Sequence, residues 1–367
     1  MRSGRHIPKQ PGKKAVIAPP RSQPTPTSGE SLRLGIDVGF GHVKYSIEMI
    51  GKAMDGTLQL ETATFPAVCC PSVGSELSGS SGLASNRSAV LKIAPTCFYL
   101  YGENAALEDS GGSCKPLHDG YAKTADYEVF VKAVLSFRGY PQVVERLVLG
   151  VPVHTSQQVI QHLKLRFVGK LFVDDRYVEV KEVRVIEQPV AGLVWHIYRS
   201  GRQEALAGRM VLTIDVGYRT VDWVVTSGLK LVSGRSGSSA SGVHKLVAAL
   251  AERLSIDLRE DCRSLNMRRR IEESLRQGSE NLLIGGTPVS MARYDDQLDA
   301  IIRAALSPVW AGVGTTADIT DVLLLGGGAK KFEASVRAQL TNRRVTLPES
   351  PELSIVKGLQ FLAEASQ

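Results

Sequence analysis

The chain has 367 residues, of which 43% are hydrophobic and 22% are charged, and its formal net charge is +7. This length corresponds to about two or three domain-sized units, and the composition is ordinary for a globular protein. No run of about eighteen apolar residues is present, which excludes a transmembrane helix, and the N-terminus lacks the apolar segment of a secretory signal. The five cysteines form no CxxC pair, which argues against a disulfide scaffold or a cysteine-rich zinc site. We therefore expect a cytoplasmic protein that makes no membrane contact.

The positive charge is concentrated in residues 1–30. This segment holds six basic residues, one acidic residue and six prolines, and it has few large apolar side chains. Such a composition cannot offset the entropy lost on ordering, so we predict a disordered tail. Its charge favours non-specific contact with DNA or another anionic partner. A tail that only aids solubility is the alternative.

The predicted elements of the first half begin with a strand–turn–strand pair. Apolar runs and periodicity predict the following segments in chain order: strands at 32–38 and 43–49, a Ser/Gly-rich loop at 70–90, a helix at 125–138, a strand at 146–153, a helix at 156–168, one or two strands within 172–186, and a helix at 190–198 that Pro189 opens.

The second half repeats this beginning. Its predicted segments are strands at 212–216, 220–227 and 229–234, a helix at 243–254, a largely helical stretch at 255–300, a strand at 321–325, a helix at 329–340 and a last helix at 353–365. Alternating strands and helices predict an α/β fold.

One short motif occurs twice in the same context. Residues 34–39 read LGIDVG and residues 212–217 read LTIDVG, 178 positions later, and an apolar strand follows each copy after a tight turn. A single Asp-x-Gly is common in turns, but two copies in register within matching strand pairs are hard to attribute to chance. The repeat predicts two similar hairpins.

These hairpins favour phosphate binding. Glycine at a hairpin tip lets a phosphate approach the backbone N–H groups. An aspartate at the end of each first strand, Asp37 and Asp215, is suited to a hydrated Mg²⁺. Lys44 follows Asp37 by seven residues and can neutralise a phosphate oxygen, whereas the second copy has Asp222 at that place. A solvated strand lysine is the alternative for Lys44.

Two further motifs fit a nucleotide site. Residues 323–328 read LLLGGG before a predicted helix, which suits a nucleotide lying against the backbone, although the segment is neither a Walker A loop nor GxGxxG. Residues 187–192 read EQPVAG at a helix entrance. Glu187 there either stabilises the helix N-terminus or positions a water at the γ-phosphate.

The two hairpins, the EQPVAG motif and the LLLGGG motif occur in an order that resembles that of the actin-like ATPases. These proteins belong to the superfamily of actin, sugar kinases and heat-shock ATPases. Residues 150–153 (GVPV), 187–192 and 351–361 (PELSIVKGLQF) are similar to segments of the plasmid-segregation ParM/StbA family, and within it to the D proteins of plasmid PRTRC cassettes. The resemblance implies an actin-like ATPase fold of two duplicated ribonuclease-H-like domains with a nucleotide cleft between them. The implied domains are 31–205, with an insertion at about 51–122, and 206–367, with an insertion at about 255–318.

The resemblance also implies roles for individual residues. Glu187 and Asp215 would be catalytic, and Asp37 and Asp215 would hold Mg²⁺ through water. The implied nucleotide-binding residues are Asp37, Gly39, Phe40, Gly41, His42 and Lys44 in the first hairpin, Gly217, Tyr218, Arg219, Thr220 and Asp222 in the second, and Gly326, Gly327, Gly328 and Lys330 near the adenosine. ATP or ADP and Mg²⁺ would be the cofactors.

The implied function is slow ATP hydrolysis coupled to self-assembly into filaments, for plasmid segregation through a DNA-bound adaptor. The alternatives are a small-molecule kinase and an ATP-gated scaffold with little turnover. Tyr218 and Arg219 depart from the small residues common at this hairpin tip, so they either contact phosphate or narrow the site. Arg268, Arg269 and Arg270 form a DNA or filament contact or a solvated helix face.

Overall fold

The computed structural model describes residues 32–52, 58–72, 90–108, 120–138, 141–201 and 203–365. The predicted tail at 1–30 and most of the predicted loop at 70–90 lie outside these residues. Within them, no helix is long and apolar enough to cross a bilayer.

The first half is built on a seven-stranded mixed sheet in the order β3-β2-β1-β7-β9-β8, with β10 also pairing with β7. Its strands are β1 (Leu32–Val38), β2 (His42–Lys52), β3 (Leu58–Pro66), β7 (Val143–Val151), β8 (Gly169–Val173), β9 (Arg176–Val180) and β10 (Val183–Glu187). The parallel strands β1 and β7 are largely buried, which explains the apolar run at the end of β7.

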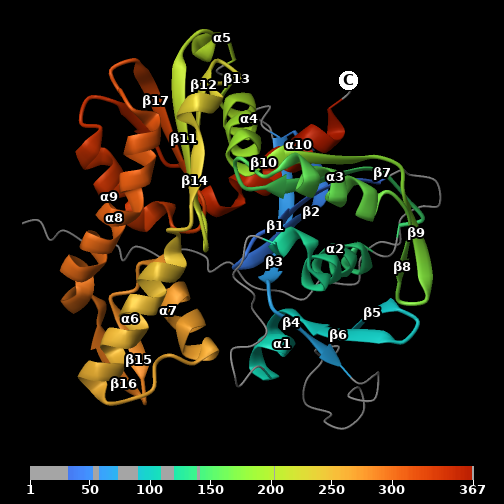
Figure 1. The fold of residues 1–367 in the computed structure, drawn as a ribbon, viewed down its shortest axis with the longest axis horizontal. Coiled ribbons are helices and arrows are strands. Elements are labelled where there is room, and N and C mark those ends of the chain that lie inside the picture. Colours follow the sequence, from blue (N-terminus) through green and yellow to red (C-terminus); the bar gives the residue numbers. More distant parts are fainter. Residues whose placement is uncertain are drawn as a thin grey trace, which may run out of the picture.

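The second half repeats this plan with a six-stranded sheet in the order β13-β12-β11-β17-β18, with β14 pairing with β12. Its strands are β11 (Met210–Val216), β12 (Val221–Ser227), β13 (Lys230–Leu231), β14 (Gly237–Ser239), β17 (Ile319–Leu325) and β18 (Arg344–Thr346). In the first half β1 pairs antiparallel with β2 and parallel with β7. In the second half β11 pairs in the same way with β12 and β17. Figure 1 shows the two halves side by side, the second on the left.

Helices pack on the sheets and connect them. They are α1 (Gly102–Glu108), α2 (Ala125–Phe137), α3 (Gln157–Phe167), α4 (Gln188–Ser200), α5 (Gln203–Leu206), α6 (Val243–Leu258), α7 (Leu265–Gln277), α8 (Asp295–Val313), α9 (Ala329–Gln339) and α10 (Ser354–Glu364). Ser156, the first residue of the helix predicted at 156–168, is the N-cap of α3, and its side chain accepts a hydrogen bond from Val159 N. Every predicted helix is found with ends within a few residues, and the predicted strand at 229–234 is reduced to β13.

Each half carries a small module beyond its main sheet. In the first half it is a three-stranded sheet of β4 (Cys69–Ser72), β5 (Val90–Ala94) and β6 (Cys97–Tyr101), followed by α1. In the second half it is α7 with the hairpin of β15 (Asn281–Ile284) and β16 (Thr287–Ser290). This hairpin lies in the stretch predicted as largely helical, and the Gly285–Gly286 pair at its turn is the signal that marks it.

The predicted insertions are too long. The segment 51–122 includes β3, which belongs to the main sheet. The segment 255–318 includes α8, which packs on β12 and β14 and contributes Leu306 and Val309 to the core of the second half. Apolar side chains distributed along α8 bury it in that core, so only the small modules project.

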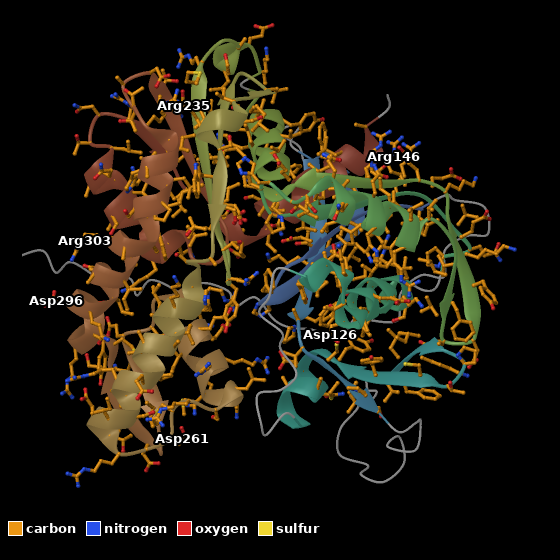
Figure 2. All side chains as sticks on the ribbon, in the orientation of Figure 1. Asp126, Arg146, Arg235, Asp261, Asp296 and Arg303 are labelled. Atoms are coloured by element: carbon orange, nitrogen blue, oxygen red, sulfur yellow. The ribbon has the colours of Figure 1, made fainter. Side chains whose placement is uncertain are left out.

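The boundary 206–367 assigns the last helix to the second half. In the structure this helix packs on the first half instead. The apolar face of α10 packs on β1, β7 and α4, with Ile355 and Leu359 against Val148. Gln360 Oε1 accepts a hydrogen bond of 2.7 Å from Gly35 N. Arg146 of β7 donates to the Ala363 and Ala365 carbonyls at 3.0 and 2.7 Å (Figure 2). The C-terminal helix therefore joins the first sheet to the junction of the halves.

Candidate functional site

The two aspartate motifs form matching hairpins. In β1–β2, Asp37 lies directly opposite Lys44, and in β11–β12, Asp215 lies opposite Asp222. Each turn is closed by a backbone hydrogen bond, from Gly39 N to His42 O at 3.2 Å and from Gly217 N to Thr220 O at 2.9 Å. The repeat in the sequence is therefore a repeat in structure, with the same register and a different residue opposite each aspartate.

In the first hairpin the aspartate is neutralised. Asp37 is 1% exposed, and its Oδ2 accepts a hydrogen bond of 2.8 Å from Lys44 Nζ. Its Oδ1 accepts another of 2.7 Å from Gln188 Nε2, at the start of α4. Burial opposes the charge on Lys44, but the Asp37 carboxylate, with Asp215 and Glu352 further away, raises the pKa of the ammonium above its ordinary value. The Lys44 ammonium thus interacts with carboxylates of both halves and is not a solvated surface lysine.

In the second hairpin the aspartate has no such cation. Asp215 is 4% exposed, and its Oδ1 has no hydrogen-bond partner among the described residues. Burial, with the charges of Asp222 and Asp37, raises the pKa of Asp215 to about 8, although Lys44 acts in the opposite direction. A buried carboxylate oxygen without a partner is costly, so this atom is suited to a cation or a donor from a ligand.

Asp222 connects the two halves. It is fully buried, and its Oδ1 accepts a hydrogen bond of 3.0 Å from Val153 N, just beyond β7. Thr220 Oγ1 donates to its other oxygen. Burial raises the pKa of Asp222 to about 6, while hydrogen bonds from Thr220, Ser238 and Val153 act against that rise. The predicted nucleotide-binding residues Thr220 and Asp222 therefore already bond within the protein.

Glu187 lies at the end of β10, where its backbone enters α4. Its Oε1 accepts a weak hydrogen bond of 3.4 Å from His154 N, and its charge contributes to the raised pKa of Asp222. The sheet places Glu187 beside Val151 at the ends of parallel strands. Glu187 therefore faces the same junction as Asp222, but the structure assigns it no contact with Asp215.

The two hairpin tips meet. The guanidinium carbon of Arg219 lies 5.1 Å from the centre of the Phe40 ring, which stacks on Tyr121 at 4.5 Å. A Cβ added at Gly41 would lie 3.1 Å from the Cβ of Tyr218. Tyr218 and Arg219 thus join the second hairpin to the first, which the sequence did not predict.

The glycine triplet is partly explained by packing. Gly326 has a φ of +89°, and an added Cβ would lie 2.3 Å from Asp215 Oδ1, so only glycine fits there. A Cβ at Gly328 would lie 2.5 Å from Val216, whereas one at Gly327 would meet nothing within 4 Å. Gly326 and Gly328 thus let the β17–α9 turn approach β11, and Gly327 faces open space. Lys330 is exposed at the start of α9.

The donor set of the site suits Mg²⁺ bound through water. In the described part of the chain, no group of three or more His, Cys, Asp or Glu side chains is arranged to hold a metal ion. Mg²⁺ keeps several waters and needs only one or two carboxylates together with substrate phosphates. The unpartnered Oδ1 of Asp215 fits that requirement, whereas both oxygens of Asp37 already accept hydrogen bonds.

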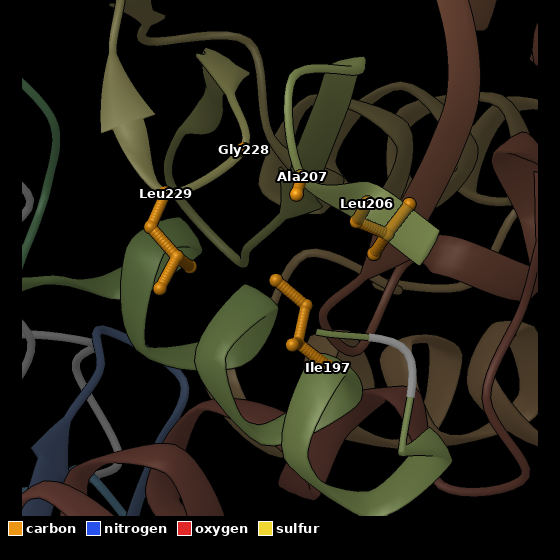
Figure 3. A pocket seen from close by; sticks show the side chains of 5 residues that line it. All are labelled: Ile197, Leu206, Ala207, Gly228 and Leu229. Atoms are coloured by element: carbon orange, nitrogen blue, oxygen red, sulfur yellow. The ribbon is translucent and has the colours of Figure 1, made fainter. Parts of the chain in front are cut away.

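Two cavities lie away from the hairpin residues. One, of about 230 Å³, is lined by Ile197, Leu206, Ala207, Gly228 and Leu229, where α4 meets the β12–β13 turn (Figure 3). The other, of about 290 Å³, lies between α4 and the start of α10 and includes Arg199 and Lys357. Neither is lined by a predicted site residue.

Sequence reasoning did not single out Gln188 or Glu272. Gln188 follows Glu187 and is 9% exposed. The available sequence signal was a polar residue next to Glu187 at the start of a predicted helix. Glu272 lies on α7, with its Oε1 3.9 Å from His42 Nδ1. No local pattern brings α7 to the first hairpin, so only the tertiary structure identifies it.

The comparisons agree with the geometry. A family model described as the N-terminal domain of actin-like proteins matches residues 35–190, and one described as the C-terminal domain of archaeal MreB-like actin homologues matches residues 213–338. No curated protein sequence matches the chain.

Solved structures show the same architecture. The archaeal actin homologue Ta0583 in complex with ADP superposes with a TM-score of 0.68 at 18% identity, over 91% of this chain and 99% of that chain. A ParM filament from Clostridium botulinum gives 0.68 at 14%, over 91% and 99%. Bacillus thuringiensis ParM with ATP gives 0.59 at 12%, over 91% and 98%. At these identities the similarity establishes the fold, which is actin-like.

Proposed function

The chain belongs to the actin-like proteins, and we propose that it binds Mg-ATP between its halves, hydrolyses it slowly and assembles into filaments. The observation that carries this proposal is the pair of matching hairpins, which brings Lys44, Asp37 and Asp215 into one buried cluster. That cluster combines a cation for phosphate with a carboxylate oxygen that lacks a partner. Relatives of the same fold have been solved with ADP and with ATP.

In the proposed mechanism the halves have different tasks. Lys44 neutralises phosphate oxygens, and Gln188 holds the Asp37 carboxylate on its far side. Asp215 and, through water, Asp37 would hold Mg²⁺, which neutralises phosphate charge when bound. Glu187 accepts a proton from the attacking water or orients it. Gly327 leaves room for the nucleotide beside β17.

The assembly part of the proposal rests on the fold. One relative with this architecture is a ParM filament, which supports self-association of the present chain. We propose that plasmid segregation through a DNA-bound adaptor is the use of such a filament, and that the basic segment 1–30 adds non-specific DNA contact.

One observation favours the scaffold alternative. Tyr218 and Arg219 bring the hairpin tips together, and such contacts slow the access of a nucleotide or of water. A protein that binds ATP in this way and turns it over rarely would act as a nucleotide-gated interaction module.

The deciding experiment follows assembly and chemistry together. Purified protein is pelleted and followed by light scattering with Mg-ATP, Mg-ADP or no nucleotide, while phosphate release is recorded. Assembly with ATP and coupled phosphate release are expected. Nucleotide binding without either would favour the scaffold, and phosphate release without assembly would favour a kinase and prompt a screen of acceptors.

A further inference from the structure

The larger of the two cavities lies where α4, α10 and the segment after β18 meet. Its volume is about 290 Å³, which suits a small ligand rather than a folded partner. Arg199 lines it from the last turn of α4, and Lys357 lines it as the fourth residue of α10. The two helices pack side by side in the middle of the molecule (Figure 1). The cavity therefore brings together two basic side chains that are 158 positions apart in the sequence.

These two basic side chains lack an acidic partner. Arg199 is exposed, and Lys357 is half-buried. In the part of the chain that the structure describes, neither side chain has an ion-pair or hydrogen-bond partner. Burial and the charge of Arg199 hold the pKa of Lys357 below its ordinary value, although Glu352 and Glu349 act in the opposite direction. The Lys357 ammonium is thus a partly desolvated charge that the protein itself does not neutralise.

The start of α10 adds to the positive potential of the cavity. This helix has eleven residues, its N-cap Leu353 forms no side-chain cap, and its first turn contains no acidic residue. The N-terminus of a helix is the positive end of its dipole, so an anion there is stabilised and a cation is not. Lys357 and the helix start therefore both favour a negative charge in the cavity, and neither compensates the other.

We propose that this cavity binds a small oxyanion of the phosphate class, with Lys357 and Arg199 as its cations. Such an anion has oxygens in several directions, so it can contact a lysine and an arginine from two helices at once. Ser350 also lines the cavity, and its hydroxyl can donate a further hydrogen bond. Glu349 lies on the same lining and is exposed, which together with the small volume disfavours an extended polyanion such as DNA.

A ligand in this cavity would contact both halves. α10 packs on the first sheet, and α4 contacts β11 and β17 of the second sheet as well as β7 and β10 of the first. Residues 346–350 continue from β18 of the second sheet. A bound oxyanion therefore stabilises the arrangement of the two helices against the second half. The proposal goes beyond the proposed function and does not depend on it, because no hairpin residue lines this cavity.

Trp195 provides a local probe, because it lines the cavity and is 5% exposed. The nucleotide-free full-length protein is titrated with sodium phosphate or sodium sulfate, with sodium chloride keeping the ionic strength constant, and tryptophan fluorescence and melting temperature are recorded. Both anions are expected to change the fluorescence in a saturable way and to raise the melting temperature. Trp195→Phe should lose the fluorescence change. A chain whose fluorescence and melting temperature respond to neither anion would overturn the proposal.

Three variants locate the binding. Lys357→Met and Arg199→Gln each remove one cation of the cavity, and each should weaken phosphate binding at least about tenfold. The control is Arg303→Gln, at an exposed position on α8 that Figure 2 labels, which removes an equal charge and should bind as the unchanged chain does. In chloride alone, Lys357→Met should melt no lower than the unchanged chain, because it loses a cation that has no partner. Equal phosphate affinity in all of these proteins would mean that phosphate binds elsewhere, and the proposal would fail.

A phosphate ester then distinguishes the source of the anion. Glycerol 3-phosphate that binds at least as tightly as inorganic phosphate would identify a phosphorylated metabolite, and weaker binding would identify free phosphate. Either result supports the site if Lys357→Met and Arg199→Gln weaken it. Ester binding that these two variants leave unchanged would overturn the assignment to this cavity.

Discussion

The two hairpins have the same backbone and opposite electrostatics. In the first, Lys44 lies across the ladder from Asp37 and neutralises it. In the second, Asp222 occupies that place, so two buried carboxylates lie side by side and Asp215 keeps an oxygen without a partner. The residue opposite the aspartate, Lys44 or Asp222, thus decides whether the charge of that aspartate is neutralised within the hairpin or requires a cation from outside. The following predictions test this asymmetry, from the largest expected effect to the smallest.

The strongest test removes the unpartnered carboxylate. Asp215→Asn keeps the shape of the side chain but removes the carboxyl group that can ionise to hold Mg²⁺, so Mg-dependent phosphate release should fall at least about a hundredfold. Asp296→Asn, at an exposed position on α8, is the control and should retain full activity. Unchanged turnover in Asp215→Asn would contradict the two-hairpin mechanism.

Glu187 separates binding from chemistry. Glu187→Ala should lower phosphate release about a hundredfold, because Glu187 is the group that we propose to accept the proton of the attacking water, while the affinity for ATP stays the same. Equilibrium binding of a fluorescent ATP analogue and single-turnover hydrolysis measure the two effects. Loss of binding would show that Glu187 supports the β10–α4 connection instead.

Lys44→Met disturbs the first hairpin. It leaves the Asp37 carboxylate buried with Gln188 as its remaining partner, so the free energy of unfolding should fall by about 3 kcal/mol. Urea unfolding followed by circular dichroism gives this value, and ATP affinity should fall as well. A variant as stable as the unchanged chain would mean that Lys44 does not neutralise Asp37.

Asp222→Asn is the matched change in the second hairpin. It removes a negative charge beside Asp215 and keeps an oxygen for the bond from Val153, so the free energy of unfolding should change by only about 1 kcal/mol or less. The same urea experiment applies. A loss as large as that of Lys44→Met would show that the hairpins are electrostatically alike.

Removal of residues 1–30 should have the smallest effect. The hairpins and the contacts around them lie outside this segment, so phosphate release and thermal stability should stay within error of the full chain. Affinity for DNA at low salt should decrease, because six basic residues are lost. Loss of folding or of turnover would contradict the prediction of a disordered appendage.

The basic cluster of α7 shows that the sequence around a residue does not predict its distant partner. Arg268, Arg269 and Arg270 suggested either an outside contact or a solvated face. Arg269 instead pairs with Glu103, and Arg270 donates to the Leu283 carbonyl. A run of charge carries no information on which distant acid faces it, because that depends on how the two halves dock.

The sequence by itself predicted most of the helices and strands and the duplication. Alternating and continuous apolar runs locate strands and helices, and the repeated IDVG motif identifies the two matching hairpins. Only the tertiary structure decided the contacts between distant segments. Gln188 reaches Asp37 across 151 positions, Arg269 reaches Glu103 across 166, and α10 returns to the first sheet. Hydrophobic periodicity says which face of a helix is buried, but it does not say against which partner, because that choice follows from the packing of the whole chain.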